Sequence, residues 1–413
     1  MIVGQGYVGL PVALRAVEVG HDVVGFDIDE VRIERLKVAS SFIEDISDTD
    51  LAEALASGRF LPSRNTADLA GFDIAVISVP TPLHETAPDL SYIESAGRML
   101  TPHLRAGSCV ILESTTYPGT TEEILIPILE ESGLRAGLDF HVGYSPERID
   151  PGNKTWTFVN TPKVVAGIDE ASAKVVDDFY STLVDRTVMV PGVKEAELTK
   201  LLENTFRHVN VALVNELAIF AHDLGIDVWS VIDAASTKPF GYMRFTPGPG
   251  VGGHCLPIDP SYLSWQVRRT LGHAFRFVEL ANDVNEHMPD YVAQRVIAHL
   301  NRDRKAVNGS RILLVGLSYK KDSGDARESP AMQVAERLHL LGAELHGCDP
   351  LIDQRFKPDY IATADLSEAE LEAADLIVVL TEHSMFDWDL VARFGAKVLD
   401  TRNRVAADDV DRL

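Results

Sequence analysis

Short apolar runs alternate with helical stretches along the first part of the chain. Residues 1–3 form a short apolar run that leads into a glycine-rich turn and a helical stretch over 10–19. More apolar runs follow at residues 21–27, 74–79, 109–113 and 141–144. This alternation of strands and helices predicts a doubly wound parallel sheet. Because the first run is so short, we expect the natural chain to begin a few residues earlier.

The last third of the chain repeats this pattern. Residues 311–316 resemble the opening strand and turn, residues 343–349 resemble the second strand, and residues 375–380 parallel residues 73–78. We therefore predict an α/β protein with two Rossmann-like, doubly wound parallel-sheet domains joined by a long central helix. The second domain lacks the glycine triplet of the first, so we do not expect it to hold a dinucleotide in the same way.

The predicted central helix spans residues 195–224, which contain no proline or glycine and have helical periodicity. A helix of this length would run about 45 Å, enough to bridge two domains. Lys200, Asn204 and Arg207 lie on one side of that helix, because their spacing matches successive helical turns. Polar groups aligned in this way on an inter-domain helix indicate a binding or catalytic site. The alternative is a helix face that is merely exposed to solvent.

Composition narrows the class of protein. The chain has 413 residues, which suits two or three domains. Its net charge of −24 argues against nucleic acid or an anionic membrane as a partner. The three cysteines are far apart, no signal peptide is recognisable, and no run approaches the roughly 20 apolar residues of a membrane-spanning helix. We therefore expect a cytoplasmic protein.

A glycine triplet follows the first predicted strand. Gly4, Gly6 and Gly9, with Tyr7 and Val8 between them, permit a tight turn and a close approach of the backbone to a ligand. A pyrophosphate would then sit at the N-terminus of the next helix. The pattern predicts dinucleotide binding, and the alternative is an α/β domain that binds a mononucleotide or no nucleotide.

An acidic residue ends the second predicted strand. Asp27 is placed to accept hydrogen bonds from an adenosine ribose, and its charge would repel a 2′-phosphate. These properties favour NAD over NADP as the cofactor. Arg32 lies in the following helix, where it could contact the ribose or the pyrophosphate instead.

A second glycine-rich segment, residues 247–260, contains Cys255. Four glycines in six residues make a loop whose backbone can wrap closely around a ligand. A thiolate nucleophile is favoured by nearby positive charge, which Lys200 could supply, while Asp259 could orient a water or that lysine. The alternative is a buried structural cysteine. That role suits the other two cysteines, which lie in predicted strands: Cys109 and Cys348. No pair of Cys or His residues has metal-ligand spacing, so we predict no metal site.

Residues 316–330 lie where a phosphate-binding loop would lie in the second domain. Lys320 and Arg327 are candidate partners for an anionic ligand. The alternative is a charged turn followed by a helix with its cap at Ser329 and Pro330 in its first turn.

Motifs spread over nearly the whole chain carry a family resemblance. They are Gly-Tyr-Val-Gly-Leu-Pro at 6–11, Val-Pro-Thr-Pro at 79–82, Glu-Ser-Thr at 113–115, Ser-Pro-Glu-Arg at 145–148, Ala-Glu-Leu-Thr-Lys at 196–200 with Glu203-Asn204, Gly-Gly-His-Cys at 252–255, and residues 320–327. With these motifs the chain resembles the nucleotide-sugar 6-dehydrogenases, which include UDP-glucose, GDP-mannose and UDP-N-acetylhexosamine dehydrogenases. The resemblance implies an NAD-binding Rossmann domain over residues 1–190, a central helical dimerisation domain with the cysteine loop over 191–300, and a Rossmann-like UDP-sugar-binding domain over 301–413.

The resemblance implies a four-electron oxidation of a primary alcohol at C6 of the sugar, without release of the aldehyde. NAD takes the hydride in each step, Cys255 adds to the aldehyde to give a thiohemiacetal, and water hydrolyses the thioester formed by the second oxidation. Lys200 and Asn204 would stabilise the developing oxyanion. The residues implied to organise water and proton transfer are Thr115, Glu147 and Asp259.

The resemblance also implies ligand contacts and a partner. The further residues that look like cofactor contacts are Thr81, Thr115 and Arg327. Those that look like substrate contacts are Glu147, Arg148, Lys200, Asn204, Arg207, Arg244, Gly252 and Lys320. Family members usually pair so that the central helix lies at a dimer interface, so we expect a homodimer.

The sequence departs from the UDP-glucose pattern at Ile258, where those enzymes generally carry a lysine. Residues 238–244, His254-Cys255 and Phe206-Arg207 look closer to the UDP-N-acetylglucosamine branch, and residues 145–153 are shared with enzymes that act on N-acetylated sugars. We therefore expect UDP-N-acetylglucosamine as the favoured substrate. UDP-glucose, or another nucleotide hexose such as UDP-N-acetylmannosamine, is the alternative.

Two other classes of protein are alternatives to this function. A two-electron alcohol or hydroxyacid dehydrogenase would use Lys200 and Asn204 without needing Cys255, and would form one NADH per substrate. A non-catalytic NAD-binding protein would keep the fold and bind the cofactor without turnover.

Overall fold

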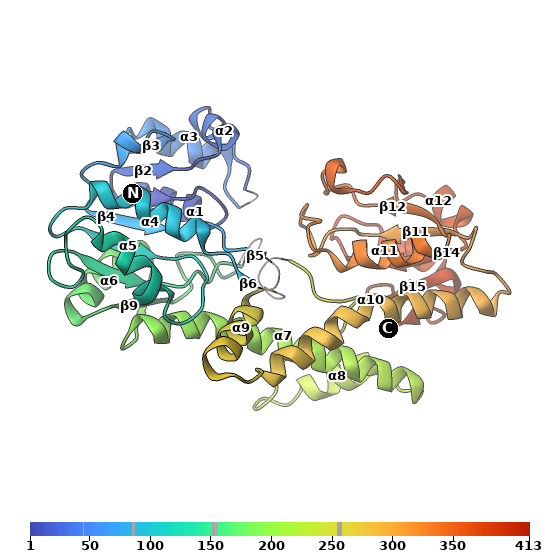
Figure 1. Ribbon diagram of the computed structural model, residues 1–413. Coiled ribbons are helices and arrows are strands. Elements are labelled where there is room, and N and C mark those ends of the chain that lie inside the picture. The colour runs from blue at the N-terminus through green and yellow to red at the C-terminus, as the bar shows by residue number, and fades with distance from the viewer. Residues whose placement is uncertain (44, 85–86, 151–152, 154, 254–257) are drawn as a thin grey trace. The chain divides into compact units, whose positions relative to one another are not determined.

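The computed structural model describes residues 1–43, 45–84, 87–150, 153, 155–253 and 258–413 (Figure 1). The chain forms two compact units. The first comprises Met1–Glu203 with Trp265–Leu271, and the second comprises Asn204–Ser264 with Gly272–Leu413. Each unit has its own large β-sheet, which confirms the predicted α/β class with two Rossmann-like domains.

The first unit contains an eight-stranded sheet in the order β10-β9-β8-β7-β4-β1-β2-β3. Its strands are parallel except for the antiparallel pair β8 and β9. The strands are β1 Ile2–Val3, β2 Val23–Phe26, β3 Phe60–Ser63, β4 Ile74–Ile77, β7 Cys109–Leu112, β8 His141–Tyr144, β9 Lys163–Gly167 and β10 Thr187–Met189. Strands β5 Leu83–His84 and β6 Ala87–Pro88 form a separate antiparallel pair. Because β1 lies between β2 and β4, the carboxyl ends of these strands form the switch point at which such sheets bind ligands.

Helices cover both faces of this sheet. They are α1 Gly9–Glu18, α2 Glu30–Lys37, α3 Asp48–Ala56, α4 Ser91–Leu100, α5 Ile126–Glu130 and α6 Glu170–Leu183, with the short 3₁₀ helices η1 Thr66–Leu69 and η2 Thr101–His103 and the π-helix η3 Thr121–Leu125. Successive strand residues point to opposite faces. Ile2 therefore joins the apolar cluster formed with α1, α3 and α6, while Val3 joins the cluster formed with α4 and α5.

The predicted central helix is present as α7, Val193–Asp223. Its residues up to Glu203 belong to the first unit and the remainder belong to the second. The other helices of this part of the chain are α8 Val228–Ser236, α9 Asp259–Leu271 and α10 Arg276–Arg302.

The second unit contains a six-stranded parallel sheet in the order β13-β12-β11-β14-β15-β16. Its strands are β11 Arg311–Val315, β12 Glu344–Cys348, β13 Ile361–Thr363, β14 Leu376–Val379, β15 Val398–Asp400 and β16 Asp411–Arg412. Its helices are α11 Pro330–Leu340, α12 Glu368–Ala373 and α13 Trp388–Ala392, with short turns η4 Gln354–Phe356 and η5 Gly395–Lys397. Strand β11 lies between β12 and β14, as β1 lies between β2 and β4. The repeat seen in the sequence is therefore a repeat of topology.

Candidate active site

The glycine turn of the first unit has the geometry of a phosphate cradle. Gly4 has a φ of 91°, and a Cβ atom there would lie 2.6 Å from the carbonyl oxygen of Ser78. A Cβ atom on Gly9 would lie 1.9 Å from the carbonyl oxygen of Gly4, so both glycines are required by the turn itself. A Cβ atom on Gly6 would meet nothing within 4 Å. Space therefore remains beside the N-terminus of α1, where a pyrophosphate of NAD fits.

Asp27 is fixed beside this turn at the end of β2. Its Oδ2 accepts hydrogen bonds from the Gln5 backbone N–H at 2.8 Å and from the Arg32 guanidinium at 2.7 Å. Its Oδ1 accepts from the Asp29 backbone N–H at 2.9 Å. The Arg32 guanidinium therefore contacts this acid, and the contact of Asp27 with an adenosine ribose remains a prediction.

Thr81 and Thr115 come together at the same edge of the sheet. They follow the neighbouring strands β4 and β7, and the Thr81 hydroxyl donates to the Thr115 carbonyl oxygen at 2.8 Å. This contact places both residues at the carboxyl ends of β4, which pairs with β1, and of β7, which pairs with β4. Their roles as cofactor contacts remain predictions.

A buried charge cluster lies at the ends of strands β7, β8 and β9. Lys163 donates to a carboxylate oxygen of Glu113 and, at 3.2 Å, to Oε2 of Glu147. The Tyr180 hydroxyl on α6 donates to the other oxygen of Glu113 at 2.9 Å. All four side chains are buried. The sequence predicted only Glu147, although Glu113 directly follows the apolar strand β7 and Lys163 is the first residue of the apolar strand β9. A charged residue at such a place is a signal for a buried pair.

The cluster shifts the pKa values of Glu113 and Glu147 in opposite directions. Burial raises the pKa of Glu113 to about 7, and the Lys163 ammonium opposes this shift only in part. Burial would also raise the pKa of Glu147, but Lys163 and the hydrogen bonds from Glu113 and Ile149 hold that pKa below its ordinary value. Glu147 is therefore kept ionised and able to accept a proton.

Lys200 on α7 contacts the segment after β8 that carries Glu147. Its ammonium is buried and donates to the backbone carbonyl oxygen of Glu147 at 2.5 Å. The next residue, Arg148, donates to both carboxylate oxygens of Glu203 on α7, with Nη2–Oε1 at 2.5 Å and Nε–Oε2 at 3.3 Å. Two cation contacts thus join the segment after β8 to the first part of α7. The predicted contact of Arg148 with substrate remains a prediction.

A further buried acid on α7 was not predicted from the sequence. The Glu197 carboxylate accepts hydrogen bonds from the backbone N–H groups of Gly119 at 2.6 Å and Thr121 at 2.9 Å. Burial raises its pKa to about 7, although these hydrogen bonds favour the charged form. Glu197 caps the start of η3 and so fixes the part of α7 that carries Lys200.

In the second unit, Asn204 and Asp259 form a buried pair. The Asn204 amide donates to Oδ2 of Asp259 at 2.5 Å, and Asp259 is the first residue of α9. The covered face of α7 continues with His208, which contacts Asn282 at 2.7 Å. Arg207 is exposed. Packing against α10 thus favours His208 where helical spacing alone had indicated Arg207, whose contact with substrate remains a prediction.

The glycine-rich loop packs against the segment that carries Lys320. A Cβ atom on Gly252 would lie 2.7 Å from the carbonyl oxygen of Glu328, and one on Gly253 would lie 2.7 Å from the Tyr319 ring. These glycines are therefore required by close packing within the second unit. Cys255 lies outside the described residues, so its role as nucleophile remains a prediction.

The other predicted arginines pair with nearby acids. Arg327 forks onto the Asp325 carboxylate, with Nε–Oδ1 at 2.9 Å and Nη2–Oδ2 at 2.7 Å. Arg244 pairs with Asp233 at the surface. Their proposed ligand contacts remain predictions.

Cys109 and Cys348 are buried in strands, as predicted for structural cysteines. Burial raises the pKa of each thiol to about 12, so neither is a thiolate at neutral pH. Within the described part of the chain, no group of His, Cys, Asp and Glu side chains could hold a metal ion. Nor is any helix there long and apolar enough to cross a membrane.

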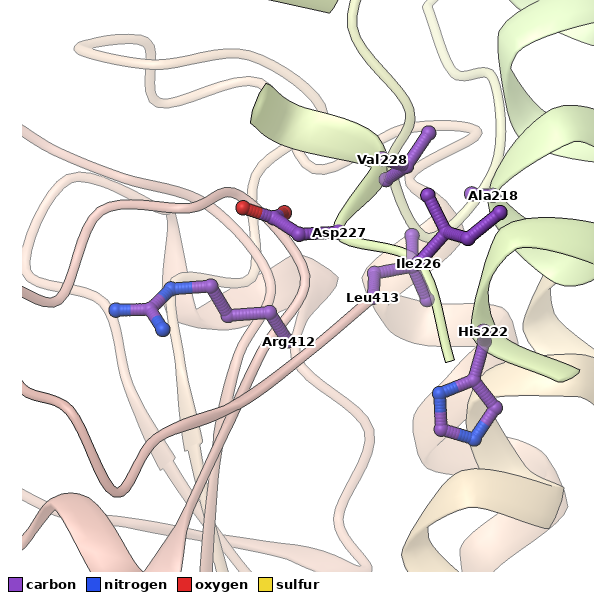
Figure 2. Close-up of a pocket in the computed structure, with 7 residues that line it drawn as sticks. All are labelled: Ala218, His222, Ile226, Asp227, Val228, Arg412 and Leu413. Atoms are coloured by element: carbon purple, nitrogen blue, oxygen red, sulfur yellow. The ribbon is translucent and has the colours of Figure 1, made fainter. Parts of the chain in front are cut away.

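A cavity of about 250 Å³ lies apart from the predicted site residues (Figure 2). Its lining comes from the end of α7, the start of α8 and the end of the chain: Ala218, His222, Ile226, Asp227, Val228, Arg412 and Leu413. None of these residues was predicted to bind cofactor or substrate.

Comparison with known proteins gives the family. The NAD binding domain of the UDP-glucose/GDP-mannose dehydrogenase family matches residues 1–184, its central domain matches 194–287 and its UDP binding domain matches 313–407. The chain belongs to this family. It is thus an NAD-dependent nucleotide-sugar dehydrogenase, as the resemblance predicted, and the glycine turn with Asp27 fits that cofactor.

Individual relatives of this dehydrogenase cover nearly its whole length. A UDP-N-acetyl-D-mannosamine dehydrogenase of Pyrococcus horikoshii is 35% identical over 408 residues, 97% of this chain and 94% of that one. A UDP-N-acetyl-D-glucosamine 6-dehydrogenase of Pseudomonas aeruginosa is 36% identical over 390 residues, 93% of this chain and 90% of that one. The solved structure of the UDP-D-ManNAc dehydrogenase from Pyrococcus horikoshii matches with a TM-score of 0.89, 34% identity and coverage of 100% of this chain and 98% of that one. A UDP-glucose dehydrogenase structure from Pyrobaculum islandicum matches with a TM-score of 0.87, 27% identity and coverage of 100% and 95%.

Proposed function

We propose that this dehydrogenase oxidises the C6 alcohol of a UDP-N-acetylhexosamine to the uronic acid, with UDP-N-acetylglucosamine as the preferred sugar. The alcohol, two NAD and one water give the carboxylate, two NADH and three protons. The observation that carries the proposal is the buried Lys200 ammonium, held on the carbonyl oxygen of Glu147 at 2.5 Å. A cation fixed in this way stabilises negative charge on an oxygen at the reacting carbon.

The chain supplies an oxyanion site and a base. Bound NAD would accept the hydride in each oxidation. Lys200 and Asn204 are four residues apart on α7 and so lie on the same side of the helix. We assign both as hydrogen-bond donors to the C6 oxygen. Asn204 is oriented by Asp259, and Lys200 by the segment of Glu147. The ionised Glu147 carboxylate takes a proton from the water that hydrolyses the thioester.

Cys255 forms that thioester. Its thiolate adds to C6 of the aldehyde, forming a C–S bond, and the thiohemiacetal loses a hydride and a proton to become the thioester. Attack by water then breaks the C–S bond and releases the carboxylate and the thiol. Retention of the aldehyde on sulfur explains why no free aldehyde leaves between the two oxidations.

Two observations favour an N-acetylated sugar. The curated relatives at 35% and 36% identity are named for UDP-N-acetylmannosamine and UDP-N-acetylglucosamine. Ile258 stands where UDP-glucose enzymes generally carry a lysine. We infer that the pocket accepts the N-acetyl group at C2 and that UDP-glucose is the poorer substrate.

The test is a count of NADH formed per sugar consumed, with five candidate substrates assayed separately. They are UDP-N-acetylglucosamine, UDP-N-acetylmannosamine, UDP-glucose, dTDP-glucose and GDP-mannose. We expect two NADH per sugar and the highest kcat/KM with UDP-N-acetylglucosamine. One NADH per sugar would indicate a two-electron dehydrogenase, and no turnover would indicate a non-catalytic NAD-binding protein. A clear preference for another sugar would correct the substrate and leave the chemistry in place.

We also propose that two copies of the chain pair through α7. Exposed apolar side chains follow helical spacing along it: Phe206, Leu213, Leu217 and Phe220. Burying such a stripe against a second copy is favourable. Leu213→Glu with Phe220→Glu should change the solution mass from two chains to one, as measured by light scattering after size exclusion. Leu340→Glu, at a residue 79% exposed on α11, is the control and should stay paired. A wild-type mass of one chain would contradict the proposal.

A further inference from the structure

The two sheets carry equivalent acids. Asp27 follows β2 in the first sheet, and Asp349 follows β12 in the second. Each accepts at Oδ1 from the backbone N–H two residues later, at 2.9 and 3.0 Å. Each also accepts at Oδ2 from the turn after the first strand of its sheet, from Gln5 at 2.8 Å and from Leu317 at 2.7 Å. Asp349 therefore occupies in the second sheet the position that Asp27, the acid predicted to bind the ribose, occupies in the first.

The surroundings of the second acid differ. Asp349 also accepts from the Ser318 backbone N–H at 3.0 Å and from Nε2 of His383 at 3.0 Å, and both side chains of this last pair are completely buried. His383 is the fourth residue after β14, as Thr81 is the fourth residue after β4. In the second sheet a histidine therefore lies beside the acid, and Asp349 accepts its hydrogen bonds from groups of the protein.

The other ring nitrogen of His383 holds a loop. Nδ1 accepts from the Asp322 backbone N–H at 2.9 Å, so the ring is neutral with its proton on Nε2. Asp322 has a φ of 56°, in the left-handed region, where a residue other than glycine needs fixed partners. Its carboxylate accepts from the Ser384 backbone N–H at 2.6 Å and from the Ser384 hydroxyl at 2.7 Å. Hydrogen bonds with His383 and Ser384 thus fix the loop at Asp322.

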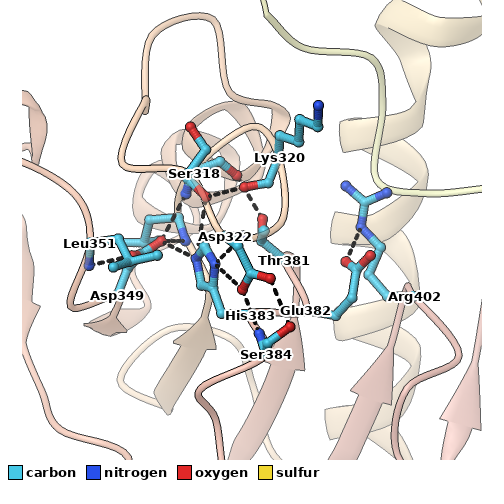
Figure 3. Close-up of polar contacts among 12 residues, drawn as sticks. Ser318, Lys320, Asp322, Asp349, Leu351, Thr381, Glu382, His383, Ser384 and Arg402 are labelled. Atoms are coloured by element: carbon cyan, nitrogen blue, oxygen red, sulfur yellow. Dashed lines mark hydrogen bonds and ion pairs between the residues drawn. The ribbon is translucent and has the colours of Figure 1, made fainter. Parts of the chain in front are cut away.

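The loop fixed in this way, residues 318–322, carries Lys320. The Ser318 hydroxyl donates to the Lys320 carbonyl oxygen at 2.9 Å, and the Thr381 hydroxyl donates to the Ser318 carbonyl oxygen at 2.6 Å. The Lys320 side chain extends away from the buried ring of His383 (Figure 3). The backbone of residues 318–322 is therefore fixed at both ends.

We propose that His383 is a positioning residue, which fixes the loop of residues 318–322 and thereby places Lys320 for the phosphates of the UDP-sugar. Only the identity of the ligand at Lys320 rests on the proposed function. His383 acts through the loop and touches no reacting atom. In the first sheet Thr81, the equivalent residue after β4, donates to the Thr115 carbonyl oxygen, whereas in the second sheet His383 orders the substrate loop.

Three variants separate the two contacts of the ring. His383→Gln puts an amide donor near the position of Nε2 and keeps the bond to Asp349, whereas His383→Asn puts an amide oxygen near Nδ1 and keeps the bond to Asp322. His383→Ala removes both. Asp349 retains three backbone donors without the ring, so the contact with Asp322 should decide the position of the loop. His339→Gln on α11, in the same unit, is the matched control.

The first measurement is hydrogen exchange of residues 317–325 in the whole enzyme without ligand. We expect protection to fall about tenfold in His383→Ala and His383→Gln, and to fall less in His383→Asn. The control should match the wild type. Wild-type protection in His383→Ala would overturn the proposal. This readout does not depend on activity, so it also decides the role of His383 in the loop if no UDP-sugar is turned over.

The second measurement separates KM from kcat. His383→Ala and His383→Gln should raise KM for the UDP-sugar about tenfold with kcat changed by less than about twofold, because a disordered loop weakens ground and transition states alike. KM for NAD should stay at the wild-type value. A loss of loop protection without a change in KM would overturn the placement of Lys320 for substrate. Wild-type enzyme without turnover on any UDP-sugar would contradict the proposed function instead.

Discussion

The Cys255→Ser enzyme should complete the first oxidation and fail at the second. A serine hydroxyl has a much higher pKa than a thiol, so it supplies almost no anionic nucleophile at neutral pH. Without the thiohemiacetal, the second hydride transfer has no substrate held in the site. We expect carboxylate formation to fall by about 10³-fold or more. Mass spectrometry of the quenched reaction should show aldehyde or its hydrate, with at most one NADH per sugar.

The remaining cysteines provide matched controls for this experiment. Cys109 and Cys348 are buried in β7 and β12, where burial raises their pKa to about 12. Cys109→Ala and Cys348→Ala should therefore still form two NADH per sugar. Binding of NAD to the Cys255→Ser enzyme should also be unchanged. Carboxylate formed by that variant at the wild-type rate would exclude Cys255 as the nucleophile.

Much of the fold was predictable because local patterns determine it. The glycine triplet and the apolar runs located five strands of the first sheet, β1, β2, β4, β7 and β8, and three of the second, β11, β12 and β14. The other strands of the two sheets were not predicted. The absence of proline and glycine located α7 within about two residues of its observed ends. The repeat of strand, turn and acid in the last third predicted the second sheet. These features depend on neighbours in the sequence, and a linear pattern records such neighbours directly.

The contacts that fix the site were less predictable, because they join residues that are distant in the sequence. Lys163 and Glu113 are 50 residues apart, and His383 and Asp322 are 61 apart. Each becomes a neighbour only once the order of the strands is known. Arg207 shows the limit of helical spacing as a guide. The spacing placed Arg207 on the same side of α7 as Lys200, but packing against α10 buries His208 instead. Periodicity gives the direction of a side chain, but tertiary packing decides which direction is covered.

The two sheets also show how one topology serves two ligands. In the first, the acid after the second strand and a glycine turn leave room for a dinucleotide. In the second, the equivalent acid is bound by protein donors, including His383. Loss of the glycine triplet was visible in the sequence and predicted the loss of dinucleotide binding. The contacts by which His383 joins Asp349 to the loop of Lys320 link residues distant in the sequence, so no local pattern predicted them.

Lys163→Met should lower the free energy of unfolding of the first unit by about 3–5 kcal/mol at pH 8, because it leaves two buried carboxylates without their shared cation. The methionine keeps most of the volume of the lysine stem, so the change is mainly electrostatic. Calorimetry should show the first unit melting roughly 10 °C lower. Activity should fall as well, since the charge that holds the Glu147 carboxylate in place is lost.

The pH dependence of this loss identifies its cause. Removing Lys163 raises the pKa of Glu113 further and also raises the pKa of Glu147 from its lowered value, because burial then acts without its main opposing charge. An acid with a folded pKa above its unfolded value of 4.5 loses stability as the pH rises from that value through the folded pKa. In the wild type this window for Glu113 ends near pH 7, and in the variant it extends higher and includes Glu147. The deficit should therefore be smaller at pH 5 than at pH 8, and Glu113→Gln combined with Lys163→Met should recover part of it. A deficit that is equal at both pH values would show that lost packing, and not stranded charge, is responsible.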